Sequence, residues 1–280
     1  GERQRSGAGE CDAGGGTGKE LDIDIYDTAR NPFRQLIVWD PDDEEIIGGY
    51  RYIHCQDLPR SKTGSFLSPT AHLFNFTQKF IDEYVPVTIE LGRSFVQPAY
   101  QASFNVRKGM FSLDNLWDGL GALVIENPSV KYFFGKVTMY THYDVKARDT
   151  LLYFLNRYFP DPDKLVYPHE PVMIECPDCG FEKLFNGGSY EENYRILNQT
   201  IRDYRENIPP LVNAYMNLSP SMRFFGTAIN HSFGGVEESG ILITIKDVYE
   251  KKKTRHLATY IKKMNLLNFK LRIIRRNEAH

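Results

Sequence analysis

Long apolar runs are missing from this sequence: nowhere in its 280 residues do 18 apolar residues follow one another. A helix that spans a membrane needs about 20 such residues, so we expect no spanning segment. Residues 1–20 also lack the charged start and apolar middle of a secretory signal peptide. These absences lead us to expect a cytoplasmic protein.

Cysteine is scarce, with four residues at uneven spacing: Cys11, Cys55, Cys176 and Cys179. Four are too few for a disulfide scaffold in a chain of this length, which indicates a reducing compartment. Cys176 and Cys179 have the spacing of half a zinc ribbon, but no second pair supplies the other ligands. A tight turn with two buried thiols is the more ordinary interpretation, and we expect no metal site.

The composition is that of an ordinary globular protein, with 41% hydrophobic and 25% charged residues, which argues against a disordered or fibrous chain. The formal charge of −2 hides an asymmetry. Residues 246–280 hold eleven Lys or Arg against three acids, a net of +8, so the remainder carries about −10. The basic end suits an acidic carrier protein, an anionic lipid surface or nucleic acid, and charge alone does not choose among them.

The most informative stretch is residues 87–100, which begins as a β-strand but contains three residues that a buried strand normally avoids. These are Glu90, Gly92 and Arg93. A glycine inside a strand often marks a bulge or a close backbone approach, and a carboxylate beside a guanidinium is a base, an anion clamp or a simple ion pair. A salt bridge at the end of a strand is the alternative.

Residues 90–96, Glu-Leu-Gly-Arg-Ser-Phe-Val, resemble the Glu-Xxx-(Ser/Gly)-Arg-(Ser/Phe) signature of two related groups of enzymes. One is the acyl-homoserine-lactone synthases. The other is the ornithine or glycine N-acyltransferases of bacterial aminolipid synthesis, often labelled putative hemolysins. Both are branches of the GNAT acyltransferase fold. Residues 92–94 and 96–100 look closer to the aminolipid branch.

Two further features occur in the order that this resemblance implies. Asp24 and Asp27 stand in an alternating, acidic segment, residues 21–27, which we expect to be extended. Residues 34–40 and 46–55 read as a hairpin around an acidic turn, and Arg51 falls where the related synthases carry an arginine. If the sheet assembles as implied, Arg51 meets Asp27 or Glu90.

The whole pattern predicts an α/β (α+β) fold: a GNAT-like mixed central sheet flanked by helices, with a C-terminal strand pair and a basic helix. We divide the chain into a flexible loop (1–20), an acyltransferase domain (21–250, with an insertion at about 160–190) and a basic tail (251–280). The expected helices are 71–84, 113–126, 150–159 and 191–207, and the expected later strands are 132–140, 222–230 and 240–246. Because the chain does not begin with Met, we expect it to be processed or truncated at its start.

A basic glycine-containing segment precedes the expected helix at 113–126, and it contains Arg107, Lys108 and Gly109. Backbone N–H groups at a helix start receive phosphates, and GNAT enzymes hold the donor in such a loop. The usual Arg/Gln-x-x-Gly-x-Gly/Ala pattern is incomplete here. That departure weakens the case for coenzyme A and leaves room for a carrier-protein donor.

Acyl transfer to an amine requires a base, and the resemblance assigns this role to Glu90. Asp24 and Asp27 then bind the substrate ammonium or position a water molecule. Within this assignment Glu90, Asp24 and Arg93 form the catalytic group.

The remaining residues of the motif are assigned to substrate binding. Arg93 and Arg51 fix the carboxylate of an amino-acid acceptor or order the acidic cluster. Gly92 allows a close approach to the backbone of the strand. Backbone N–H groups near Ser94 and Phe95 stabilise the oxyanion if the strand is bulged there.

The resulting hypothesis is an N-acyltransferase that moves a fatty acyl group, including a 3-hydroxyacyl group, to an amino acid in aminolipid synthesis. Its partners would be acyl-carrier protein or acyl-CoA as donor, the amino-acid acceptor, and an anionic membrane at the basic tail. No covalently bound cofactor and no nucleic acid are implied. The alternatives are a lactone-synthase-like enzyme, a non-catalytic binding module, or a membrane-active hemolysin-like protein.

Overall fold

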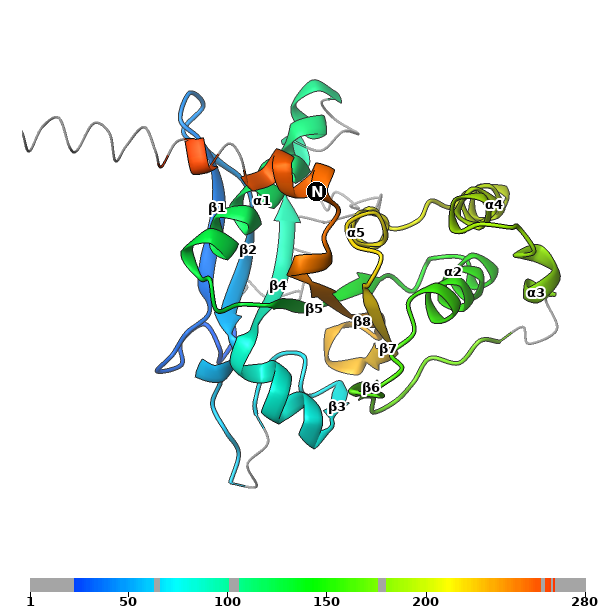
Figure 1. The fold of residues 1–280 in the computed structure, drawn as a ribbon, viewed down its shortest axis with the longest axis horizontal. Coiled ribbons are helices and arrows are strands. Elements are labelled where there is room, and N and C mark those ends of the chain that lie inside the picture. Colours follow the sequence, from blue (N-terminus) through cyan, green and yellow to red (C-terminus); the bar gives the residue numbers. More distant parts are fainter. Residues whose placement is uncertain are drawn as a thin grey trace, which may run out of the picture.

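The computed structural model describes residues 23–62, 66–100, 106–175, 180–257, 260–262 and 264, with the backbone alone for residues 106–114. Six strands form the main sheet, in the spatial order β1 (Arg34–Asp40), β2 (Glu45–His54), β4 (Thr88–Val96), β5 (Tyr132–Met139), β8 (Val236–Thr244) and β7 (Arg223–Asn230) (Figure 1). β4 and β5 are parallel, whereas every other pair of neighbours is antiparallel. The predicted mixed sheet is therefore confirmed.

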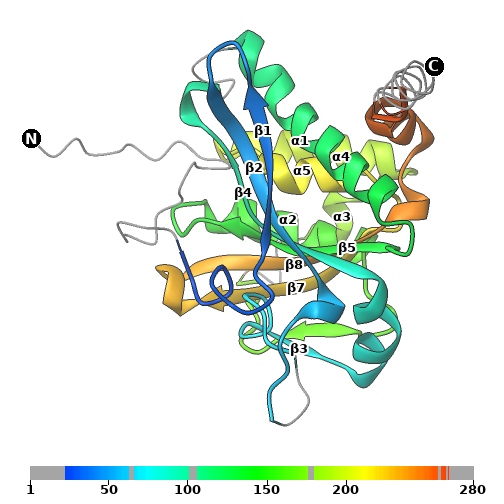
Figure 2. The same cartoon turned by 90° about the vertical axis from the view of Figure 1, so that its left-hand side faces the viewer.

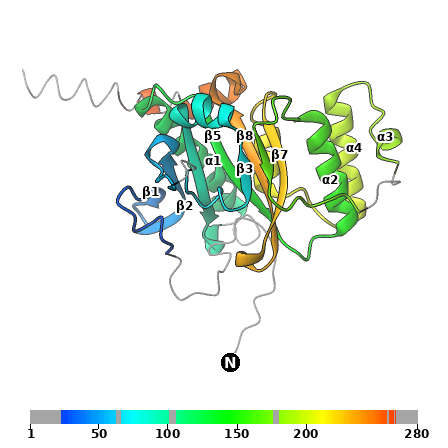
Figure 3. The ribbon, with the colours of Figure 1, turned by 90° about the horizontal axis from the view of Figure 1, so that it is seen from below.

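Helices cover one face of this sheet, and a small second sheet covers the other. The labelled helices are α1 (Val106–Glu126), α2 (Val145–Tyr158), α3 (Phe181–Leu184), α4 (Tyr190–Asp203) and α5 (Pro210–Met216). α1 contacts β1 and β2, while α2 contacts β7 and α4. Figure 3 shows α2, α3 and α4 at the β7 end of the molecule, far from β1. Among the described residues, no helix has the length and apolar character needed to cross a bilayer.

The second sheet pairs β3 (Phe74–Phe76) with β6 (Val166–Pro168). Aromatic rings join it to the main sheet: the ring centroids of Phe76 and Phe134 lie 5.7 Å apart, and those of Phe80 and Phe134 5.6 Å. Edge-to-face contacts of this kind add to the free energy gained by burying the rings. The segment before β4 is thereby held against the sheet face to which Phe134 points.

The β1–β2 hairpin follows the sequence closely, because its signals are local. β1 has the predicted bounds, and β2 differs from the prediction by one residue at each end. In the turn, the Asp40 carboxylate accepts the backbone N–H of Asp42 at 3.0 Å, and Glu44 takes a positive φ of 53°. Aspartate commonly stabilises turns in this way.

β4 and β5 pair over a short distance and then separate. Their register runs from Thr88 opposite Tyr132 to Leu91 opposite Gly135, and the described residues show no pairing between the two strands beyond that point. Farther along, β4 pairs only with β2 and β5 with β8. In Figure 2, β2 and β4 rise steeply while β5 and β8 run across the view. We call the place where the strands part the β4–β5 fork.

The helix predicted at residues 71–84 is wrong in its first half, and only residues 78–84 are helical. Residues 74–76 form strand β3, and a π-helical turn, Phe80–Tyr84, follows. Phe74 and Phe76 alternate with Asn75, and they pair with Pro168 and Val166, about ninety residues later in the chain. That distant partner cannot be read from local spacing, so the aromatic residues were mistaken for a helical stripe.

Other boundaries also need correction. The segment at 21–27 is not extended where it is described, since residues 25–27 form a turn. α1 begins at Val106 instead of residue 113, α4 ends at Asp203, and α5 was not predicted. The insertion expected as a loop at 160–190 contains β6 and α3, and β8 begins at Val236 instead of residue 240.

Several predictions fall where the structure gives no description. The flexible loop at 1–20, the pair Cys176 and Cys179, and most of the basic tail lie outside the described residues. Residues 251–257 of that tail are helical.

Candidate active site

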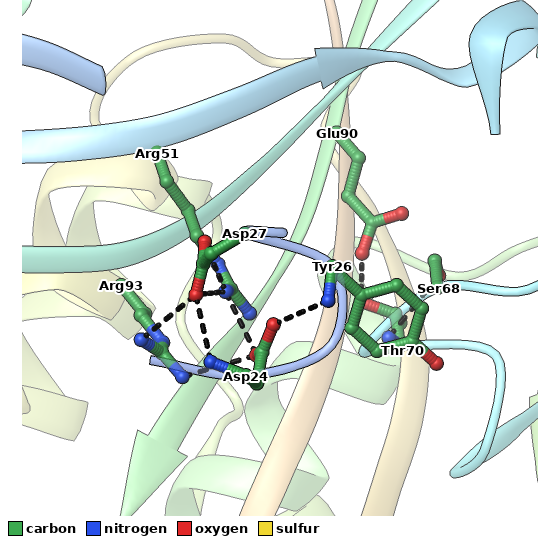
Figure 4. A network of polar contacts seen from close by, with 8 residues as sticks. All are labelled: Asp24, Tyr26, Asp27, Arg51, Ser68, Thr70, Glu90 and Arg93. Atoms are coloured by element: carbon green, nitrogen blue, oxygen red, sulfur yellow. Dashed lines mark hydrogen bonds and ion pairs between the residues drawn. The ribbon is translucent and has the colours of Figure 1, made fainter. Parts of the chain in front are cut away.

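Four charged side chains from three distant segments meet in one ion cluster, which consists of Asp24, Asp27, Arg51 and Arg93 (Figure 4). Nη1 of Arg51 lies 2.8 Å from Oδ2 of Asp24 and 3.0 Å from Oδ1 of Asp27. Nη2 of Arg93 lies 3.0 Å from the same Oδ2 of Asp24, and its Nη1 lies 3.4 Å from Asp27. Of the two partners expected for Arg51, Asp27 and Glu90, it is Asp27 that forms the ion pair.

A local turn places the two aspartates side by side. Oδ1 of Asp24 accepts the backbone N–H of Tyr26 at 2.8 Å, and the N–H of Asp24 donates to Oδ2 of Asp27 at 3.0 Å. Asp side chains compete with extended backbone through such bonds, which is why this segment turns despite its alternating sequence. The N–H of Phe33 donates to the carbonyl of Tyr26 at 3.1 Å and ties the turn to the start of the hairpin.

A bulge in β4 brings Arg93 into the cluster. Gly92 pairs with Arg51 and Phe95 with Gly49, so that two residues of β4, Arg93 and Ser94, stand opposite a single residue of β2. Arg93 has a positive φ of 45°. Non-glycine residues rarely adopt this conformation, and holding one there costs on the order of 1 kcal/mol. Its ion pairs with Asp24 and Asp27 offset that cost.

Glu90 lies next to this cluster but is paired differently. It is 2% exposed, and its Oε1 accepts the hydroxyl of Thr70 at 2.6 Å. Its Oε2 is buried without a hydrogen-bond partner among the described residues. Thr70 is held in place because the hydroxyl of Ser68 accepts its backbone N–H at 3.2 Å. A buried carboxylate oxygen without a donor is costly and therefore uncommon, so this one calls for an explanation.

Burial raises the pKa of Glu90 above its usual value, and the hydroxyls of Thr70 and Ser68 and the charge of Arg51 oppose only part of that effect. For Asp24, burial acts in the same direction, but the charge and hydrogen bond of Arg51 outweigh it and hold the pKa below its usual value. Two carboxylates on neighbouring segments thus have pKa values shifted in opposite directions, a pattern found where one group is a base and another stays ionised.

Tyr26 is partly buried and Cys55 fully buried beside the carboxylates. Burial and the charges of Asp24 and Glu90 raise the pKa of Tyr26, which places this side chain near both acids (Figure 4). Cys55, just after β2, is 1% exposed, and burial together with the charge of Glu90 raises the pKa of its thiol well above the usual value.

The geometry described above agrees with comparisons with known proteins. Residues 10–108 match the acetyltransferase (GNAT) domain. The chain is 54% identical to a glycine N(alpha)-acyltransferase of Phocaeicola vulgatus over 250 residues, which is 89% of this chain and 77% of that protein. It is 55% identical to a protein of the same name from Bacteroides thetaiotaomicron over 249 residues, 89% of this chain and 74% of that protein. The chain belongs to the GNAT family of N-acyltransferases. A search of solved structures gave no significant match.

The acyltransferase fold explains the β4–β5 fork and the bulge, which lie together at one end of the strand that carries Glu90. GNAT acyltransferases take their acyl group from acyl-CoA-type thioesters, which bind as substrates without a covalent link to the protein. Within the described part of the chain, no cluster of three or more His, Cys, Asp or Glu side chains is arranged to hold a metal ion.

The other predicted motif residues occupy distinct positions around the fork. A Cβ at Gly92 would lie 3.4 Å from Nε of Arg51, so the glycine leaves room for that side chain. The hydroxyl of Ser94 is buried without a hydrogen-bond partner among the described residues. The ring of Phe95 lies over Gly49, where a Cβ would be 3.1 Å from it.

The predicted donor residues Arg107, Lys108 and Gly109 do not lie in a loop. They belong to the first turn of α1, because that helix begins seven residues earlier than expected. Their side chains lie outside the described part of the structure.

Sequence reasoning missed Thr70, whose hydroxyl donates to Glu90, and Ser68, which holds Thr70 in place. Nothing in their local sequence reveals this, since the contact joins residues twenty positions apart. It also missed Lys136 and Glu238, two charged residues on interior strands. Here a signal was present: Lys136 interrupts an apolar strand as Glu90 does.

Proposed function

We propose that the protein transfers a fatty acyl group, including a 3-hydroxyacyl group, from the thioester of acyl-carrier protein to the α-amine of glycine, in aminolipid synthesis. The observation that carries the proposal is Glu90, a buried carboxylate with a raised pKa and an unpartnered oxygen beside the β4–β5 fork. Glycine is proposed as acceptor because two relatives at 54% and 55% identity bear the name glycine N(alpha)-acyltransferase.

In the proposed reaction, Oε2 of Glu90 accepts a proton from the acceptor ammonium. The freed amine attacks the thioester carbonyl, so that a C–N bond forms while the C–S bond breaks. The amide nitrogen loses its second proton, and the leaving thiolate takes one up. A base works best when its pKa lies near the working pH, and the raised pKa of Glu90 moves this carboxyl in that direction.

The tetrahedral intermediate carries a negative oxygen, which we assign to backbone N–H groups at the bulge near Ser94 and Phe95. The register shift between β2 and β4 at this point supports the assignment, because a bulge frees backbone groups from the ladder. The ion pairs among Asp24, Asp27 and Arg51 hold Arg93, and with it the bulge, in place.

For the donor, we propose that the phosphate of phosphopantetheine lies at the start of α1, where Arg107, Lys108 and Gly109 form the first turn. The N-terminus of a 21-residue helix favours an anion there. Acyl-carrier protein is preferred over coenzyme A because the coenzyme A loop pattern is incomplete. The basic residues after 246 would favour the acidic carrier or an anionic membrane surface.

The test is a direct product assay. The purified protein is incubated with 3-hydroxyacyl groups on acyl-carrier protein or on coenzyme A, together with each of several amino acids, and products are identified by mass spectrometry. We expect N-acylglycine, formed faster from the carrier protein. Product with ornithine instead of glycine would overturn the acceptor assignment, and lactone formation from S-adenosylmethionine would favour the synthase alternative. Absence of any N-acyl product would overturn the proposal.

A further inference from the structure

A second charged group, away from the ion cluster, lies on the same face of the sheet as Glu90. Glu90 pairs with Phe134 across the parallel strands, and alternate residues of a strand share a face, so Lys136 follows on the face of Glu90. Lys136 is the first residue of β5 beyond the last pair with β4, which places it at the fork. Burial raises the pKa of Glu90, and the positive charge of Lys136 opposes part of that rise, so the two side chains interact electrostatically.

The neighbours of Lys136 fix its position and still allow its ammonium group to bind a ligand. It forms an ion pair with Oε2 of Glu238, a residue that is 3% exposed. Glu238 also accepts the side-chain amide of Asn230 at 3.0 Å and the hydroxyl of Thr138 at 3.2 Å. Two neutral donors therefore remain on this carboxylate if Lys136 turns one of its three N–H bonds to a ligand.

The arginines of the ion cluster have less freedom. Arg51 and Arg93 each contact both Asp24 and Asp27, so their positive charges are already balanced by two carboxylates. Near Lys136, partial burial and the charge of Lys136 lower the pKa of His72, which disfavours a second positive charge there. Lys136 is also paired with a carboxylate, but Glu238 keeps two neutral donors, so among these groups Lys136 is the cation best placed to turn toward a substrate.

We propose that Lys136 binds the carboxylate of the acceptor amino acid while Glu90 receives the proton of its amine. The inference rests on the proposed function and assigns to Lys136 the carboxylate-binding role that the motif suggested for Arg51 and Arg93. In an α-amino acid a single carbon separates the two ionic groups, so a base and a cation that bind them must lie close together on one surface. Glu238 is then a positioning residue, held by Asn230 and Thr138.

The experiment compares Lys136→Met with the wild type on two acceptors, glycine and glycinamide, which has the amine but no carboxylate. We expect the KM for glycine to rise at least about tenfold, with a smaller change in kcat, because a charge-assisted hydrogen bond to the ground state is lost. With glycinamide, kcat/KM should change less than about threefold. Lys136→Arg should recover part of the loss with glycine.

Folding is controlled in the same series. Lys136→Met leaves Glu238 buried without its cation, so the double variant Lys136→Met with Glu238→Gln is included, and each variant is checked by thermal unfolding. Glu238→Gln alone keeps the cation but weakens its positioning, so the preference for glycine over glycinamide should fall less than in Lys136→Met. Lys79→Met, which removes a lysine from an exposed pair with Asp163 at 2.9 Å, serves as the matched control and should leave both acceptors unaffected.

Two outcomes would overturn the inference. One is a folded Lys136→Met protein, or folded double variant, whose KM for glycine stays within about threefold of the wild type. The other is an equal loss with glycine and glycinamide, which a purely structural ion pair predicts. If the wild type does not use glycinamide, the KM for glycine and the Lys136→Arg recovery decide. Failure of the proposed function looks different, because then the wild type itself acylates no amino acid.

Discussion

Two groups of charged side chains flank the same stretch of β4, and they differ in how completely they are paired. In the ion cluster, Asp24, Asp27, Arg51 and Arg93 satisfy one another from three segments of the chain. A few residues away, Glu90 is more deeply buried, yet one of its oxygens has no partner among the described residues. The contrast indicates that the cluster builds the site, whereas Glu90 is kept available for a substrate.

The largest expected effect comes from Glu90→Gln, which keeps the size of the side chain and an oxygen that accepts from Thr70. Loss of a general base should lower kcat about 10²–10⁴-fold. Thermal stability at pH 7.5 should not fall, because a neutral amide avoids the cost of burying a charge. Steady-state kinetics and thermal unfolding measure the two quantities.

Glu83→Gln is the matched control, since Glu83 is exposed and should tolerate the change in both measurements. A Glu90→Gln enzyme whose kcat lies within about threefold of the wild-type value would reject the assignment of Glu90 as the base. Glu90 would then differ from the ion cluster only in its pairing.

Arg51→Met tests whether the ion cluster stabilises the fold. Arg51 is 3% exposed and contacts both aspartates, so its removal leaves two partly buried carboxylates that share the single guanidinium of Arg93. We expect the free energy of unfolding to fall by about 3 kcal/mol, measured by urea denaturation. Arg34→Met, at an exposed position, is the control. A loss below about 1 kcal/mol would show that the cluster does not stabilise the fold.

Thr70→Val has a smaller effect that sharpens the description of Glu90. The hydroxyl of Thr70 stabilises the ionised carboxylate, so its loss should raise the pKa of Glu90 further. The pH profile of kcat/KM should shift to higher pH, with a rate loss of about tenfold at its acidic end and recovery at its alkaline end. An unshifted profile would mean that another group controls the ionisation.

The smallest effect is a difference in the pH dependence of stability. The lowered pKa of Asp24 stabilises the fold above its unfolded-state value of about 3.9, and this contribution is lost as the pH falls through the folded-state pKa. The raised pKa of Glu90 has the opposite sign: stability decreases as the pH rises from about 4.3 to the folded-state pKa.

Asp24→Asn should therefore lower the free energy of unfolding by about 1 kcal/mol at pH 7 and make it less dependent on pH in the acidic range. Glu90→Gln should make the free energy of unfolding less dependent on pH in the range above that. Denaturant unfolding at a series of pH values would show this. Parallel pH curves for the two variants would contradict the distinction between the two groups.

The sequence predicted what depends on neighbouring residues and missed what depends on distant ones. The β1–β2 hairpin and strand β5 follow from alternation and turn residues, and their predicted bounds differ from the structure by at most one residue. Strand β3 was misread because its partner β6 lies about ninety residues away. In the site, the expected sheet placed Arg51 against Asp27 or Glu90, and the choice of Asp27 and the pairing of Glu90 with Thr70 require the folded chain.

The buried thiol of Cys55 offers a chemical reporter for this region. Thiol reagents attack the thiolate, and a sulfur that is 1% exposed with a raised pKa supplies very little of it in the native state. Alkylation of Cys55 therefore requires the end of β2 to come away from the strand that bears the proposed base. The rate at which the peptide containing this cysteine becomes labelled would measure how often the strands separate. A bound acyl donor that holds the strands together should lower that rate.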